Sequence, residues 1–190
     1  VMVKDINTGT SDSYPMYLTA TGNNLYFVAD NWTYGSELWK TDGTEAGTVM
    51  VKDIYVDDTG SYPANFTAID NILYFSANDG THGKELWKSD GTEAGTVLVK
   101  DIYSGTSSSS PGSITKVGNA IYFSASNGTK GVELWKSDGT ESGTVMVKDI
   151  YNSGTSSSNP DYFTQVGDTV YFVARNASYG YELWKSDGTE

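Results

Sequence analysis

The sequence predicts an all-β fold, specifically a β-propeller of four four-stranded blades. Three observations predict it. One repeat of about 48 residues recurs four times, each copy holds four short strand-like runs separated by Gly, Asn and Asp turns, and no copy shows a helical pattern. Four strands in about 40–50 residues are typical of a propeller blade. The rung of a β-helix, which is the alternative, would be shorter.

The repeat is clearest at its tryptophan, which lies in a Glu-Leu-Trp-Lys segment in every copy. The four tryptophans are Trp39, Trp87, Trp135 and Trp184, at steps of 48, 48 and 49 residues. A Val-Lys-Asp-Ile segment and a proline recur in the same register. We therefore predict a single domain over residues 1–190, made of repeats 1–48, 49–96, 97–144 and 145–190. Stacking such units buries the faces that one small sheet leaves open.

The third copy illustrates the predicted order of elements. Its predicted strands are Ser113 to Val117, Ala120 to Ala125, Val132 to Lys136 and Thr144 to Ile150. The turns between them are predicted at Gly118-Asn119, Asn127-Gly128 and Asp138-Gly139-Thr140. Glycine, asparagine and aspartate favour such turns because they tolerate the left-handed backbone or bond to it. The pattern thus predicts an antiparallel meander in each copy.

The two ends of the chain fit a closed ring. Val1 to Ile6 matches the fourth strand of a copy, while the last copy stops after its third strand, at Tyr181 to Lys185. Pairing of the N-terminal strand with this last strand would complete the last blade and remove an exposed sheet edge. An extra strand at the start and a missing strand at the end also fit a four-blade segment of a larger repeat assembly, so both arrangements stay open.

Composition narrows the classes of function. The formal net charge is −12, and a surface of that sign repels phosphate, which argues against nucleic acid as a partner. No apolar run approaches the ~20 residues of a membrane helix, so we expect no membrane insertion. The chain has no cysteine and is acidic and rich in Ser, Thr, Gly, Asn and Tyr. This composition indicates an extracellular or cell-surface location.

Few residues could carry catalysis. The chain has one histidine, His82, one arginine, Arg175, and no cysteine. Neither a Ser-His-Asp triad nor an arginine cluster for sialidase-like chemistry therefore has support. Glycoside hydrolysis needs a unique pair of carboxylates, whereas most acidic residues here recur in all four copies. The sequence predicts no enzyme, no catalytic residue and no cofactor.

One recurring aspartate opens the loop before the fourth strand of each copy. These residues are Asp42, Asp90, Asp138 and Asp187. We expect each carboxylate to cap its own turn by accepting backbone N–H groups. Calcium is the alternative, since Asp-Gly-Thr-Glu offers hard oxygen ligands at close spacing. The glutamate of Glu-Leu-Trp-Lys is expected to pair with a lysine or a backbone donor between blades.

The four recurring tryptophans are predicted to form a structural core between blades. Each has a fixed place in mid-strand beside a leucine, which favours packing over the alternative, a platform that stacks on sugars. Trp32 has no counterpart in the other copies and lies in a turn. We therefore expect Trp32 to be exposed.

The N-glycosylation acceptor sequence Asn-x-Ser/Thr occurs four times. The asparagines are Asn31, Asn65, Asn127 and Asn176. All but Asn65 fall in one column, the turn between the second and third strands, where they would form a row of glycan attachment points on one rim. The alternative is that asparagine stands there for its turn chemistry.

The segment Glu-Leu-Trp-Lys-Ser-Asp-Gly-Thr at Glu85 to Thr92 recurs in the other copies, with Thr41 for the serine in the first. It resembles the repeat that names the bacterial ELWxxDGT repeat proteins, and the resemblance covers the whole chain. The resemblance implies a long, secreted or cell-surface repeat chain without an assigned activity.

We therefore expect a non-enzymatic structural or adhesive module of an extracellular bacterial surface protein or filament. Its expected partners are further copies of itself or neighbouring repeats. The alternative is a lectin-like propeller that binds glycans at one site per blade, built from turn residues and tyrosines such as Tyr34 and Tyr179.

Overall fold

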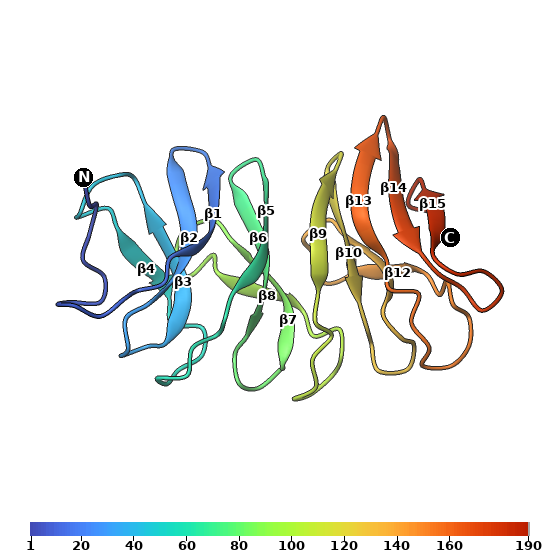
Figure 1. Cartoon of the computed structure of the whole chain (residues 1–190), viewed down its shortest axis with the longest axis horizontal. Helices are drawn as coiled ribbons and strands as arrows, with labels where there is room; N and C mark the ends of the chain where they lie inside the picture. Colours follow the sequence, from blue (N-terminus) through green and yellow to red (C-terminus); the bar gives the residue numbers. More distant parts are fainter. Residues whose placement is uncertain (190) are drawn as a thin grey trace.

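The computed structural model describes residues 1–189 and contains fifteen strands in four antiparallel sheets. Within these residues there is no helix long and apolar enough to cross a membrane. Figure 1 shows the four sheets standing side by side in chain order. The predicted all-β fold is confirmed.

Each sheet consists of consecutive strands that pair in chain order. The first sheet contains β1 (Met16–Thr21), β2 (Asn24–Asp30), β3 (Ser36–Thr41) and β4 (Val49–Lys52). The second contains β5 (Ala64–Ile69), β6 (Ile72–Asn78), β7 (Lys84–Ser89) and β8 (Val97–Lys100). The third contains β9 (Gly112–Val117), β10 (Ala120–Ala125), β11 (Glu133–Ser137) and β12 (Val145–Lys148). The fourth contains β13 (Asp161–Val166), β14 (Thr169–Ala174) and β15 (Glu182–Ser186).

The third copy shows how closely the predicted strands match. β9, β10 and β11 begin and end within one residue of the predictions, but β12 ends at Lys148 instead of Ile150. The chain leaves the sheet there because the backbone N–H of Ile150 donates to Glu133 Oε2 at 2.8 Å. The boundary predicted between residues 48 and 49 falls inside the first sheet, between β3 and β4. The predicted repeats therefore describe the sequence period and not the sheets.

The turn between the first and second strands of each sheet begins with a left-handed residue. These residues are Gly22 (φ 58°), Asp70 (φ 53°), Gly118 (φ 60°) and Gly167 (φ 61°). Two-residue hairpin loops favour positive φ because that backbone matches the twist of the flanking strands. The predicted turn at Gly118-Asn119 is confirmed.

The core lies between the sheets. One apolar cluster joins Leu38 and Val51 of the first sheet to Leu73, Phe75 and Trp87 of the second, and equivalent clusters join the later sheets. The first strands of neighbouring sheets contact one another, β1 with β5, β5 with β9 and β9 with β13. The sheets are therefore held face to face and meet at their first strands.

The predicted pairing of the N-terminal strand with the last copy is not formed in this structure. Residues 1–15 contain no strand, β15 pairs with β14 alone among the described residues, and the two termini lie at opposite ends of the row (Figure 1). Residues 1–6 lie instead on the first sheet, where Lys4 Nζ donates to the carbonyl oxygen of Thr48 at 2.9 Å. Lys52 makes the same bond to Thr96 in the next sheet, also at 2.9 Å. The N-terminal segment thus occupies the place that a preceding fourth strand would take.

Candidate functional site

A buried glutamate on the third strand of each of the first three sheets binds the connection to the next sheet. Glu37 is fully buried, and its carboxylate accepts the backbone N–H and hydroxyl of Ser61 at 2.8 and 2.6 Å and the N–H of Ile54 at 3.3 Å. Glu85 and Glu133 repeat the pattern with Ser109 and Ser158. The predicted partner, a backbone donor between blades, is confirmed.

Burial and hydrogen bonding act in opposite directions on these carboxyl groups. The pKa of Glu37 is raised from 4.5 to about 7, because desolvation raises it by more than the hydrogen bonds from Ser61, Tyr55 and Ile54 lower it. The same desolvation raises the pKa of Glu85. In the fourth sheet Glu182 is exposed, because no further sheet covers it in this structure.

A lysine on the third strand of each of the first three sheets also contacts the next sheet. Lys40, Lys88 and Lys136 donate to the carbonyl oxygens of Gly91, Gly139 and Gly188 in the next sheet, at 2.7, 2.9 and 2.7 Å. Each of these glycines has a left-handed φ, and a Cβ on it would overlap the hydroxyl of a tyrosine from the preceding sheet. Glycine is required there because the two sheets approach so closely.

The recurring aspartates cap their turns as predicted. Asp42 Oδ1 accepts the backbone N–H and hydroxyl of Thr44 at 2.9 and 2.7 Å, and the other three aspartates bond the threonine two residues on in the same way. The hydroxyl bond from Thr44 holds the pKa of Asp42 below its usual value. Residues 1–189 contain no group of three or more His, Cys, Asp or Glu arranged to hold a metal ion. Calcium binding by the turns stays a prediction.

Three of the four recurring tryptophans are buried. Trp39, Trp87 and Trp135 are 5–6% exposed, and their indole N–H groups have no hydrogen-bond partner among the described residues. Trp184 is only partly buried and donates to the carbonyl oxygen of Ala174 at 2.9 Å. Trp87 and Trp135 lie in clusters that join two sheets, as predicted, whereas Trp39 packs with Phe27 and Ala29 of its own sheet and with Ile6. The prediction is wrong in degree for Trp184, which has no fourth strand beside it among residues 1–189. Trp32 is 69% exposed, as predicted.

The acceptor asparagines are used in two ways. Asn31, Asn127 and Asn176 accept backbone N–H groups of their own turns on Oδ1, which is the predicted turn chemistry. Asn65 lies in β5, and its Nδ2 donates to Ser76 Oγ at 3.2 Å and to the carbonyl oxygen of Pro111 at 3.1 Å. Glycan attachment at any of the four stays a prediction.

The two unusual basic residues lie in equivalent turns of different sheets. His82 Nδ1 lies 2.7 Å from Asp79 Oδ2, and this hydrogen bond raises the pKa of His82. Arg175 follows β14 and lies over the rings of Tyr151 and Tyr181, 5.7 and 5.6 Å from their centroids. The two residues are not brought together, so they do not form one site.

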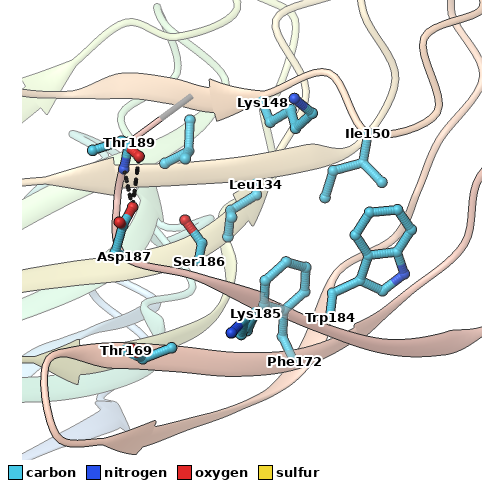
Figure 2. Close-up of a pocket in the computed structure, with 11 residues that line it drawn as sticks. Leu134, Lys148, Ile150, Thr169, Phe172, Trp184, Lys185, Ser186, Asp187 and Thr189 are labelled. Carbon is cyan, nitrogen blue, oxygen red and sulfur yellow. Dashed lines mark hydrogen bonds between the residues drawn. The ribbon is translucent and has the colours of Figure 1, made fainter.

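A cavity of about 420 Å³ lies between parts of the third and fourth sheets. Figure 2 shows Leu134 and Ile150 on one side of it and Phe172 and Trp184 on the other. In the preceding interface Met146 fills the corresponding place, where it pairs with Trp135 and packs on the core. The cavity therefore lies where a fourth strand beside β15 would place its own apolar residue. No residue motif predicts this cavity, and its one signal in the sequence is the three-strand pattern of the last copy.

The chain matches no protein-family model and no curated protein. Several solved structures do resemble it. A puromycin hydrolase matches with a TM-score of 0.59 and 16% identity over 92% of this chain and 27% of that chain. A puromycin-hydrolyzing peptidase of Mycobacterium tuberculosis matches with a TM-score of 0.57 and 11% identity over 95% and 29%. A putative TolB from Agrobacterium tumefaciens matches with a TM-score of 0.55 and 13% identity over 97% and 66%.

These likenesses support a β-propeller-like all-β fold and show the fold alone. This chain spans only about a quarter of the length of the puromycin hydrolase, 27%. Two of the three proteins are hydrolases by name, so the comparisons do not support the expectation that the chain is not an enzyme. They assign it no activity either, since at these identities a shared fold does not imply a shared reaction.

Proposed function

We propose that this chain is a non-enzymatic structural and adhesive repeat module of an extracellular bacterial surface protein or filament. The observation that carries the proposal is the use of the recurring residues. The recurring glutamates, lysines and turn glycines make contacts between one sheet and the next. When the recurring polar residues of a repeat bind one copy to the next, their common role is structural. The resemblance to ELWxxDGT repeat proteins agrees with this role.

The N-terminal residues suggest how the fourth sheet would gain its fourth strand. Residues 1–4 have the sequence Val-Met-Val-Lys, which is also the sequence of β4 and β12. We propose that residues 1–6 pair with β15 as a fourth strand, with Met2 beside Trp184 as Met146 lies beside Trp135. Within one chain this pairing closes a ring, and between chains it joins copies end to end.

Light scattering, electron microscopy and hydrogen exchange on the full chain test the proposal together. We expect compact rings or end-to-end assemblies in which the outer-edge amides of β15 exchange slowly. Deleting residues 1–6 should break the assemblies or rings and expose those amides. Replacing Met2 by Ser should weaken the same protection, because it removes the apolar side chain that would fill the cavity.

The matched control is Met16→Ser. Met16 is 48% exposed at the start of β1 and takes no part in the proposed joint. The joint is wrong if the deletion leaves both the assembly and the exchange of β15 unchanged. Hydrolysis of a substrate that stops when one non-repeating side chain is removed would overturn the non-enzymatic role.

A further inference from the structure

The turn between β14 and β15 departs from its three counterparts at neighbouring positions. Arg175 stands where the other copies have Asp30, Asn78 and Ser126, and Tyr181 stands where they have Ser36, Lys84 and Val132. Because Ala174 pairs with Glu182, the next residues outward, Arg175 and Tyr181, face each other across the turn. Both columns differ from copy to copy, so the scaffold requires no particular residue at either place, and only the fourth copy pairs an arginine with a tyrosine there.

A third departure belongs to the same group. In the second and third sheets a tyrosine of the preceding connection, Tyr55 or Tyr103, packs so closely on a turn glycine that a Cβ there would touch or overlap the ring. That glycine column holds Trp32 in the first sheet and Ala177 in the fourth. The corresponding Tyr151 lies instead beside the guanidinium of Arg175.

The guanidinium is held in place but not neutralised. Its Nε donates to the carbonyl oxygen of Ser157 at 3.0 Å, and the two tyrosine rings lie against it. The hydroxyl of Tyr181 accepts a bond from Asn159 Nδ2 at 3.3 Å, which fixes that ring. The ion pairs among residues 1–189 are His82–Asp79 and Lys130–Asp149. Arg175 thus keeps its terminal N–H groups for another acceptor, in a chain with twice as many acidic as basic residues.

We propose that Arg175, Tyr179 and Tyr181 form a binding site for a sugar that carries a carboxylate, a uronic acid unit. A planar guanidinium offers two parallel N–H donors that match a carboxylate. Tyr179 and Tyr181 are 67% and 56% exposed, and aromatic faces of this kind pack against a pyranose ring. The net charge of −12 opposes a densely charged polyanion, so a saccharide with few carboxylates is favoured. The site is single, unlike a lectin site repeated in every blade, and it is independent of the structural role.

Titration calorimetry with trigalacturonic acid, galactotriose and tetraglutamate tests the site on the full chain. We expect trigalacturonic acid to bind and galactotriose to bind at least about tenfold more weakly, since the charged hydrogen bonds are lost. Arg175→Gln should lower the affinity for trigalacturonic acid by about tenfold or more. Arg175→Lys, which keeps the charge but not the two parallel donors, should lower it by less.

Two further variants separate binding from folding. Tyr179→Ala removes an exposed ring outside the core and should also weaken binding, with an unchanged melting temperature. Lys116→Gln removes an exposed positive charge elsewhere and should leave binding unchanged. The proposal is overturned if trigalacturonic acid does not bind, if Arg175→Gln binds it as the unaltered chain does, or if tetraglutamate binds equally well.

Discussion

The carboxylate of Glu37 and the hydroxyl of Ser61 lie 2.6 Å apart and join the first sheet to the connection that enters the second. The same pair recurs as Glu85 with Ser109 and Glu133 with Ser158. Both side chains are buried in every case. Each of the first three sheets thus carries the acceptor that orients the chain entering the next sheet.

Glu85→Ala should destabilise the fold by about 2–4 kcal/mol, because it leaves the N–H and hydroxyl of Ser109 buried without an acceptor. Urea unfolding monitored by tryptophan fluorescence measures the loss. Glu182→Ala is the matched control, since Glu182 occupies the same column but is exposed, and it should change stability by less than about 0.5 kcal/mol. Equal losses for the two variants would contradict the role assigned to Glu85.

Stability should fall as the pH rises from 5 to 8. Burial raises the pKa of Glu37 from 4.5 to about 7 in the folded chain. Between about pH 4.5 and 7 the folded state therefore keeps a proton on Glu37 that the unfolded chain has released. The stability that this proton provides is fully present below about pH 4.5 and is lost as the pH rises through 7. Glu37→Gln should remove about 1–3 kcal/mol of the difference in unfolding free energy between pH 5 and 8.

His82 titrates in the same direction, because its hydrogen bond to Asp79 raises its pKa. The urea titrations that compare the chain with and without Glu37→Gln are therefore made in a His82→Gln background. A pH dependence that Glu37→Gln leaves intact would show that another group is responsible.

Gly95→Ala should destabilise the second sheet by about 1–3 kcal/mol, because a Cβ at Gly95 would overlap the carboxylate of Asp90. Thermal unfolding measures the effect. Gly180→Ala is the control, since a Cβ at Gly180 has no atom within 4 Å and its φ is not left-handed. A smaller loss for Gly95→Ala than for Gly180→Ala would refute the turn geometry.

Expression in a host that glycosylates Asn-x-Ser/Thr should leave Asn65 unmodified even where Asn31, Asn127 or Asn176 is occupied. A glycan is attached to Nδ2 of the asparagine, and at Asn65 this atom donates hydrogen bonds to Ser76 and to the carbonyl oxygen of Pro111. Peptide mapping by mass spectrometry checks each position. Occupancy of Asn65 in folded protein would show that these two bonds do not both form, since a glycosylated Nδ2 keeps only one hydrogen.

Much of the fold could be predicted from residue patterns. Strands β9 to β11 match their predictions within one residue, because alternation and turn residues act locally. The end of β12 could not be predicted, since the N–H of Ile150 leaves the sheet to donate to Glu133, which lies on a different strand. The core position of Trp87 followed from its column, whereas Trp184 is partly exposed because no strand of residues 1–189 pairs with the outer edge of β15.

The period of the array, the four-strand meander and the capped turns follow from residue patterns alone, because they depend on residues close together in the chain. The individual bonds that join one sheet to the next, the position of the cavity beside Trp184 and the contact of Arg175 with Tyr151 could be found only from the tertiary structure. These relationships depend on how the sheets and their connections pack, and no local pattern specifies them. The N-terminal segment shows the difference most clearly. Its sequence marks it as a fourth strand, but its place on the first sheet follows from contacts such as Lys4 with Thr48.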